Sequence, residues 1–199
     1  MSLKFVLAAA ALAVTTGTAS ATTVFSDDFD ANTGALNTTP AGWVQNSGTV
    51  DIIPVGPDFV WYGPGSYIDM NGSTFQPGSM STSFATVMGK GYSFSFGLGY
   101  NNGSGTTEML SYAIGNLTGV IDLSTESLVV GVLKTMSFNF VALSGLTTLT
   151  FADVGTTPGD NGGPIVDNVV VATVPLPAAA PLLLAALGGL AMLRRRRRT

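Results

Sequence analysis

The stretch GYSFSFGLGY, residues 91–100, decides the fold of this chain. Large apolar side chains alternate there with serine and glycine over nine positions, at Tyr92, Phe94, Phe96, Leu98 and Tyr100. Strict alternation with a period of two is typical of a β-strand that buries one face. We therefore expect a half-buried strand here, and a second one around Met136, Phe138 and Phe140, where the pattern repeats.

Further short segments of this kind follow along the chain, separated by turn sequences such as GPG, QPGS, NNGSG and PGDNGG. The expected strands are 24–29, 50–55, 66–70, 81–87, 108–114, 127–132, 147–151 and 166–173. No window between residues 22 and 173 carries a convincing apolar stripe of helical period. Many short strands with glycine-rich turns predict an all-β fold, a β-sandwich of the jelly-roll type.

Composition excludes several classes of protein. The 199 residues include no cysteine and no histidine, which rules out thiolate and imidazole metal sites and Cys–His or Ser–His catalysis. The central part of the chain carries two basic residues, Lys90 and Lys134, against 12 acidic residues. A surface of this charge repels a phosphate backbone, so nucleic acid is not expected as a partner.

Residues 1–21 have the features of a secretory signal peptide. Lys4 supplies the positive start, residues 5–14 form a short apolar segment, and Ala19 and Ala21 frame an A-x-A cleavage site. The apolar segment is too short to span a bilayer, which needs about 20 residues. We expect signal peptidase to cleave after Ala21 and the chain to be exported.

The other end of the chain, residues 174–199, has the features of a membrane anchor. Residues 178–193 contain no charge and predict a transmembrane helix, and the prolines before them are tolerated at a helix start. A basic cluster at the end of such a helix stays on the cytoplasmic side. That cluster consists of Arg194, Arg195, Arg196, Arg197 and Arg198. The domain between the two ends, residues 22–173, is therefore expected outside the inner membrane, in the periplasm.

The order of proline motif, apolar helix and arginine cluster resembles the PEP-CTERM class of bacterial sorting signals, and more closely its VPLPA-CTERM variant of proteobacteria. The motif consists of Val174, Pro175, Leu176, Pro177 and Ala178. Leu176 stands where the commoner form has a glutamate. The resemblance implies that an exosortase recognises the tail, cleaves near the prolines, and passes the protein to the cell surface or the extracellular matrix.

The central part also resembles the galactose-binding-like jelly rolls that often precede such tails. The segments that carry this resemblance are FSDDF (25–29), GW (42–43), GTVDII (48–53), SYIDMNGS (66–73) and GDNGGPIVDNVVV (159–171). The resemblance implies a binding or structural β-sandwich and leaves the ligand open.

An aromatic segment is the candidate sugar site. Exposed aromatic rings could stack on the C–H face of a sugar while Asp58 and Asp69 accept hydrogen bonds from its hydroxyl groups. The alternative is that alternate rings of this segment simply share the core face of a strand. The aromatic candidates are Phe59, Trp61, Tyr62 and Tyr67.

Aspartates near both ends of the domain are a candidate calcium site. The first and last strands of a jelly roll often lie together, and Ca²⁺ takes 6–8 oxygen ligands. The alternative is that these residues close turns with their own backbone, as aspartate commonly does. The candidates are Asp27, Asp28 and Asp30 near the first strand, and Asp160 and Asp167, with Asp153, around the last hairpin.

These observations predict an exported, non-catalytic surface or matrix protein with exopolysaccharide as its candidate ligand. No cofactor is expected apart from the candidate structural calcium ion. The alternative function is a secreted glycoside hydrolase that acts on matrix polysaccharide with a pair of carboxyl groups. Against it, the chain has two glutamates, Glu108 and Glu126, and the domain has no arginine or histidine to position a substrate.

Overall fold

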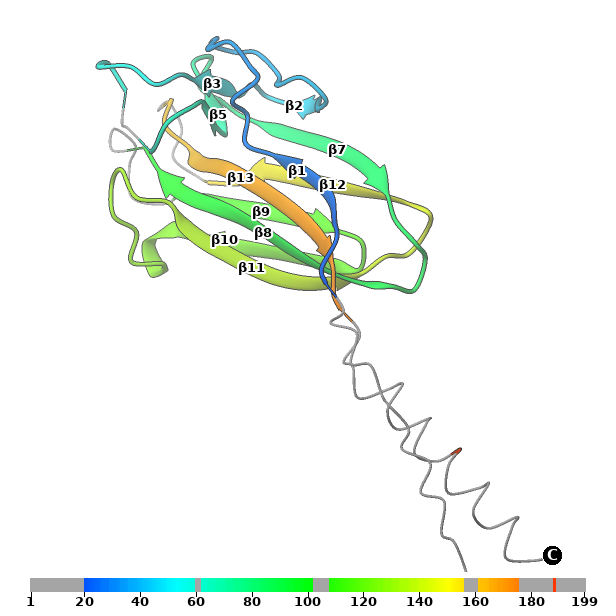
Figure 1. Ribbon diagram of the computed structural model, residues 1–199. Coiled ribbons are helices and arrows are strands. Elements are labelled where there is room, and N and C mark those ends of the chain that lie inside the picture. The colour runs from blue at the N-terminus through cyan, green and yellow to red at the C-terminus, as the bar shows by residue number, and fades with distance from the viewer. Residues whose placement is uncertain (1–19, 60–61, 102–107, 156–160, 176–187, 189–199) are drawn as a thin grey trace, which may run out of the picture. The chain divides into compact units, whose positions relative to one another are not determined.

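The computed structural model describes residues 20–59, 62–101, 108–155, 161–175 and 188 (Figure 1). Residues 22–174 form one compact unit. The expected signal peptide, sorting motif, transmembrane helix and arginine cluster lie almost entirely outside the described residues. Within the described ranges, the structure contains no helix that is long and apolar enough to cross a membrane.

The compact unit is built from two large antiparallel sheets and one short hairpin. The six-stranded sheet has the order β11 (Lys134–Val141), β8 (Gly91–Tyr100), β13 (Pro164–Thr173), β4 (Tyr67–Asp69) and β3 (Asp51–Ile53), with β1 (Thr23–Asp27) also paired to β13. The five-stranded sheet has the order β10 (Leu117–Asp122), β9 (Met109–Ile114), β12 (Leu146–Asp153), β7 (Ser79–Ala85) and β2 (Val44–Ser47). The hairpin pairs β5 (Asn71–Gly72) with β6 (Gln76–Pro77), and a single 3₁₀ turn covers Leu123–Thr125.

The expected all-β sandwich is confirmed. After β7 the chain passes repeatedly between the two sheets, as the jelly-roll arrangement requires. The first and last strands are hydrogen-bonded neighbours, with Asp27 of β1 opposite Val169 of β13. Strands β12 and β13 are not a hairpin, because they belong to different sheets. Asp153 and Asp167 therefore do not share a hairpin, contrary to the sequence prediction.

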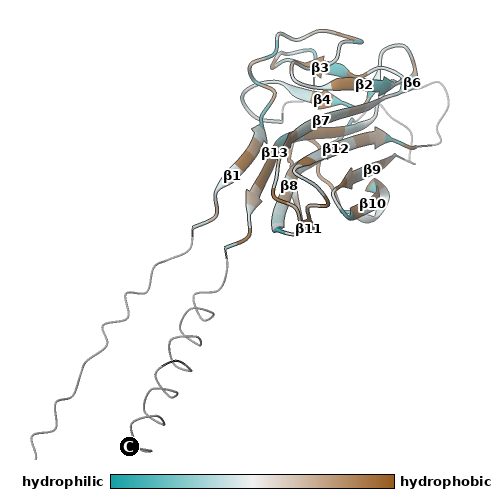
Figure 2. Cartoon of the chain, turned by 90° about the vertical axis from the view of Figure 1, so that its right-hand side faces the viewer, coloured by the Kyte–Doolittle hydropathy of each residue, from teal (hydrophilic) through white to brown (hydrophobic). Residues whose placement is uncertain are grey.

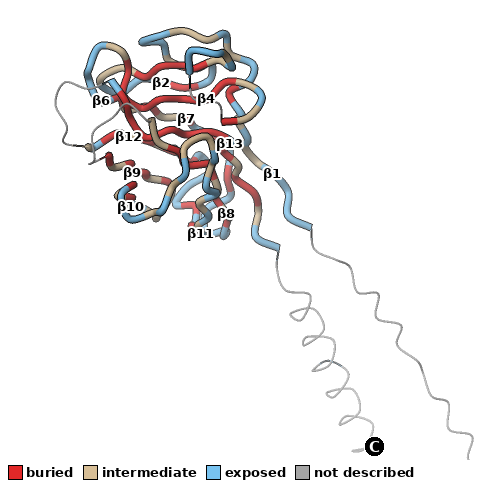
Figure 3. Tube along the Cα trace, turned by 90° about the vertical axis from the view of Figure 1, so that its left-hand side faces the viewer, coloured by how far each residue is buried: buried red, intermediate tan, exposed pale blue. Residues whose placement is uncertain are grey.

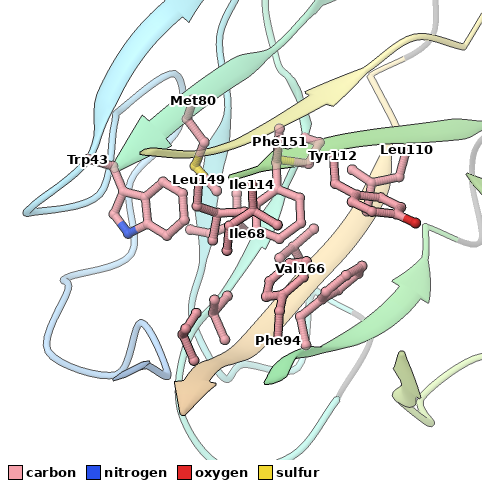
Figure 4. Packing of buried hydrophobic residues seen from close by; sticks show 14 of the residues in the cluster. Trp43, Ile68, Met80, Phe94, Leu110, Tyr112, Ile114, Leu149, Phe151 and Val166 are labelled. Carbon is pink, nitrogen blue, oxygen red and sulfur yellow. The ribbon is translucent and has the colours of Figure 1, made fainter. Parts of the chain in front are cut away.

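The core lies between the two large sheets (Figure 4). In β8, Phe94, Phe96 and Leu98 are at most 1% exposed, which confirms the alternation that decides the fold. Phe151 of β12 meets them from the opposite sheet, with its ring centroid 5.0 Å from that of Phe96. Trp43 is also buried in this core. Figure 3 shows the same division along the chain, with buried strands and largely exposed loops.

One expected strand is wrong, and the strands β2, β5, β6 and β10 were not expected. Residues 127–132 form a loop after the 3₁₀ turn, in which Ser127 and Gly131 adopt positive φ angles of 53° and 78° that interrupt an extended backbone. Val129 and Val132 are exposed in this loop. The next strand after β9 is instead β10, which pairs with β9 on the side away from β12. Its alternation is weaker because a glycine occupies one of its inward positions.

Candidate functional site

The outer face of the six-stranded sheet carries the candidate site. Ile52 of β3 and Ile68 of β4 point into the core and are 2% and 0% exposed. Their neighbours in the sequence point to the opposite face, because side chains alternate along a strand. The register places Asp51 opposite Asp69 and Ile53 opposite Tyr67. Two carboxyl groups and an aromatic ring thus meet on one face of two short strands.

A second, smaller apolar cluster forms the floor of the site. It joins Ile53, Tyr62, Tyr67 and Ile165, with Leu133 packed against it. The Tyr62 and Tyr67 rings meet edge to face with centroids 5.3 Å apart. This cluster holds the connection between β3 and β4 against the outer face of the sheet.

Tyr62 is fixed by hydrogen bonds as well as by packing. Its hydroxyl donates to the Tyr100 carbonyl and accepts from the Tyr100 N–H at 3.1 Å. A Cβ atom at Gly99 would lie 2.8 Å from Cε1 of the Tyr62 ring, so the ring needs a glycine there. Burial raises the pKa of Tyr67, so its hydroxyl remains protonated at neutral pH.

Above this floor lies a cavity of about 510 Å³. Its size is within the range of small-molecule sites, and its lining combines apolar rings with a few polar groups, as such sites do. The described lining residues include three aromatic rings, three carboxyl groups, two amides and a hydroxyl. They are Leu36, Asp51, Ile53, Asp58, Phe59, Tyr62, Tyr67, Asp69, Ser73, Asn101, Asn161 and Ile165.

Asp69 is the most deeply buried carboxyl group of the site, 2% exposed. One of its oxygens accepts the backbone N–H groups of Asn71 at 3.0 Å and Gly163 at 2.8 Å, and the other accepts the Asn101 side-chain amide at 2.8 Å. The pKa of Asp69 is raised to about 8, mainly by burial and also by the nearby Asp51 carboxylate, although these three donors act to lower it. At neutral pH the Asp69 carboxyl is largely protonated and can both donate and accept hydrogen bonds.

Asp51 organises the wall beside Asp69. Its Oδ1 accepts the backbone N–H groups of Asn37 at 2.6 Å and Ser73 at 3.2 Å, and its Oδ2 accepts the Ser73 hydroxyl at 2.6 Å. These contacts tie three separate loop and strand segments together. The carboxylate is therefore used mainly to hold the shape of the cavity.

The structure brings most of the predicted sugar-site residues together. Phe59 lines the cavity with its side chain 43% exposed, so it does not belong to the core as the alternative interpretation required. Tyr62 and Tyr67 are buried in the floor, and Asp58 is exposed on the loop beside Phe59. Trp61 lies outside the described residues.

Four polar lining residues escaped the sequence interpretation: Asp51, Ser73, Asn101 and Asn161. Asp51 lies in an expected strand, and the other three lie in or next to sequences typical of turns. Their common position follows from the pairing of β3, β4 and β13, which places segments distant in the sequence side by side.

The described aspartates among those proposed for calcium contact nearby backbone or side-chain donors. Asp27 accepts the Phe29 N–H at 2.9 Å and the Trp43 indole N–H at 2.7 Å. Asp28 accepts the Asp30 N–H at 3.3 Å, and Asp30 in turn accepts the Ser66 N–H at 2.9 Å. Asp27 and Asp28 thus close turns with their own backbone.

Asp167 lies near these carboxylates on β13. Its side chain faces away from the core because the preceding Val166 faces into it, and a β-bulge follows between Asp167 and Val170, with Asn168 at a φ angle of 51°. The pKa of Asp167 is raised to about 7, mainly by burial and also by the charges of Asp30, Asp28 and Asp27. Asp160 is outside the described residues. Among those that are described, no three carboxyl groups are arranged to hold a metal ion, so calcium binding stays a prediction.

The family described as "Protein of unknown function (DUF642)" matches residues 26–172. The chain belongs to the DUF642 family. No curated protein matches the sequence.

Several solved structures share the fold of this DUF642 domain. The Stig cyclase Fisc from Fischerella sp. TAU, in complex with an indole compound, is 12% identical with a TM-score of 0.56, over 79% of this chain and 100% of its own. The CBM22-1 xylan-binding domain of Paenibacillus barcinonensis Xyn10C is 14% identical with a TM-score of 0.50, over 81% and 100%. The K1 cleaved adhesin domain of Lys-gingipain from Porphyromonas gingivalis W83 is 14% identical with a TM-score of 0.51, over 75% and 97%. At these identities the likeness shows the fold alone.

Proposed function

We propose that this domain binds a carbohydrate in the cavity on the outer face of the six-stranded sheet, without chemical turnover. The observation that carries the proposal is the combination of the exposed Phe59 ring with the hydrogen-bonding groups of Asp58, Asp69 and Asn101 in one cavity. Sugars present C–H faces that pack on aromatic rings and hydroxyl groups that bond to carboxyl and amide groups. The shared fold of a xylan-binding domain supports this function.

Charge narrows the class of carbohydrate. Asp51 and Asp58 line the cavity, whereas Asp69 beside them is largely protonated at neutral pH and adds little charge. The two basic residues of the domain, Lys90 and Lys134, are not among its described lining residues. An anionic glycan would therefore meet like charge with no compensating cation, which selects against it. We propose a neutral glycan as the ligand.

The place of action follows from the two chain ends. We propose that the protein is exported with the aid of residues 1–21, held in the inner membrane by residues 178–193, and exposed to the periplasm. Processing by an exosortase at residues 174–178 would then release the domain to the cell surface or the extracellular matrix. A neutral exopolysaccharide of that matrix is the proposed ligand.

A glycoside hydrolase is the second candidate, because the raised pKa of Asp69 places a protonated carboxyl beside the Asp51 carboxylate. A protonated and an ionised carboxyl group are what glycoside hydrolysis requires. Those two groups must flank the scissile bond, however, whereas Asp51 and Asp69 are neighbours on adjacent strands. Asp51 is also committed to Asn37 and Ser73. The arrangement favours binding over hydrolysis.

Calorimetry on the full chain in detergent, with xylan fragments as the neutral probe, tests the proposal. Phe59→Ala should weaken binding about tenfold, since an aromatic contact contributes about 1 kcal/mol or more. Phe75→Ala is the matched control, because Phe75 is 51% exposed on the β5–β6 hairpin and does not line the cavity. It should bind as the natural protein does.

Three outcomes would contradict the proposal. Equal affinities for the two variants would place binding elsewhere. Equal affinity for polygalacturonate and for xylan fragments would refute the charge argument. Release of reducing ends, abolished by Asp69→Asn, would establish the hydrolase instead.

A further inference from the structure

Both ends of the folded domain lie at the end of the sandwich opposite the cavity. The Thr173 N–H donates to the Thr22 carbonyl at 2.9 Å, and the Val174 N–H donates to the Gly91 carbonyl at 3.2 Å. Figure 2 shows β1 and β13 side by side and running to this end. The chain thus leaves the domain directly beside the start of β8.

Two loops lie beside this exit, residues 86–90 between β7 and β8 and residues 142–145 between β11 and β12. They are hydrogen-bonded to each other, from the Gly89 N–H to the Ala142 carbonyl at 2.8 Å and from the Ala142 N–H to the Lys90 carbonyl at 3.0 Å. We call the two loops, with the strand residues that flank them, the exit loops. They form one continuous surface next to residue 174.

The exit loops expose large apolar side chains. Met88 is 73% exposed, Leu143 64%, Leu146 62% and Val87 52%. Exposed apolar residues scattered singly need no explanation, but a group on adjoining loops indicates a surface that contacts a partner. The partner must offer an apolar environment at the point where the chain leaves the domain.

Charged residues are distributed unevenly between the cavity end of the domain and the end with the exit loops. The acidic residues that the structure describes lie in the loops of the cavity end or in the strand halves next to them, for example Asp51, Asp69 and Asp153. The exit loops contain one charged residue, Lys90. An apolar surface with a single cation suits the anionic surface of a bacterial membrane, which would repel the opposite end.

The length of the connection is the third observation. Five residue steps separate Thr173, the end of β13, from Ala178, where the uncharged run begins. An extended chain covers at most about 3.6 Å per residue, so these steps span about 18 Å or less. The headgroup region of a bilayer adds only about 5–8 Å on each side. A domain anchored through residues 178–193 therefore has its exit loops within reach of the lipid headgroups.

We propose that the exit loops are a membrane-contact surface, with Met88 and Leu143 inserted among the lipid headgroups while the chain is anchored. This inference rests on the proposed anchoring through residues 178–193. The contact holds the domain upright, so that the cavity faces away from the membrane toward the matrix. It also keeps residues 174–178 at the membrane surface.

The absence of cysteine from the sequence allows a direct test with single-cysteine variants. Met88→Cys and Leu143→Cys would carry an environment-sensitive fluorophore, and Val55→Cys, at a 52% exposed position between β3 and β4 at the cavity end, is the control. The full chain is reconstituted into phosphatidylethanolamine–phosphatidylglycerol vesicles that contain a headgroup-level nitroxide quencher. The labels at positions 88 and 143 should shift to shorter wavelength and be quenched, and the label at 55 should not.

An alkaline carbonate wash separates the failure of the contact from the failure of the anchor. Removal of the chain from the vesicles by an alkaline carbonate wash would overturn the anchor and this inference with it. A chain that resists the wash, but whose labels at 88 and 143 behave like the label at 55, would overturn the contact alone.

A charged double variant separates insertion from mere tethering. With the fluorophore at Leu146→Cys, adding Met88→Asp and Leu143→Asp should shift the equilibrium away from contact by at least about tenfold, because two apolar side chains are lost. Quenching that survives both aspartates would show that the tether alone holds the loops there, and would refute the insertion. Glycan binding at the cavity should be unchanged in this variant.

Discussion

The ionisation of Asp69 should make the folded state less stable as the pH rises. Burial raises the pKa of this carboxyl from 3.8 to about 8. Between those values the folded chain holds a proton that the unfolded chain has released, so the folded state binds more protons. The free energy of unfolding then falls with rising pH, by up to about 1.4 kcal/mol per pH unit. Asp69 alone accounts for about 3 kcal/mol between about pH 5 and pH 7.

Asp69→Asn removes this proton while keeping the shape of the side chain. The amide oxygen still accepts the N–H groups of Asn71 and Gly163, and the Asn101 amide can rotate to accept from the new NH₂ group. Between about pH 5 and pH 7 the free energy of unfolding should therefore fall by about 3 kcal/mol less in the variant than in the natural protein. A smaller decline of the same sign should remain from Asp167, whose pKa is raised to about 7.

Urea unfolding of the full chain in detergent, followed by the fluorescence of buried Trp43 at several pH values, measures this effect. Asp58→Asn is the control, because Asp58 is exposed on the loop beside the same cavity. Its stability curve should follow that of the natural protein. A natural protein whose stability is flat or rises from about pH 5 to pH 8, or an Asp69→Asn variant with an unchanged slope, would refute the reasoning.

Two further predictions concern the core and the turns, both measured by urea unfolding followed by far-UV circular dichroism, which does not depend on Trp43. Trp43→Phe should cost about 2–4 kcal/mol, because it opens a cavity and removes the indole N–H that Asp27 accepts at 2.7 Å; a cost below about 1 kcal/mol would contradict this. Gly115→Ala should cost more than Gly42→Ala, although both have positive φ, since a Cβ atom at Gly115 would lie 2.6 Å from Cδ2 of Phe140 whereas at Gly42 it meets nothing within 4 Å. Equal costs would contradict the steric argument.

Most of the fold could be predicted from the sequence because its signal is local. The alternation in residues 91–100 requires one buried and one polar face, and the core accordingly takes Phe94, Phe96 and Leu98. The strand wrongly expected at 127–132 and the missed strand β10 show the limit of this reasoning. Apolar composition favoured a strand at 127–132, but the positive φ angles of Ser127 and Gly131 place the segment in a loop.

The candidate site could be predicted only in part. The aromatic segment around Phe59 and Tyr62 was found because its composition is unusual and local. The positions of Asp51 and Asn101 in the cavity wall could not be predicted. In the sequence they look like ordinary strand and turn residues, and only the pairing of the strands brings them together. Nothing in the sequence near Asp51 distinguishes it from other aspartates before β3 pairs with β4.

The sequence by itself determined the class of fold and the expectation of export and membrane anchoring. Strand alternation, the length of apolar runs and the charge at the ends are all properties of single segments. The tertiary structure decided where function can reside. The cavity depends on the register in which β3, β4 and β13 pair. The separation of an apolar end from an acidic end depends on the antiparallel pairing of the strands, which brings alternate loops to the same end of the sandwich. Both depend on which residues become neighbours across long sequence separations, and only the closed sandwich specifies those contacts.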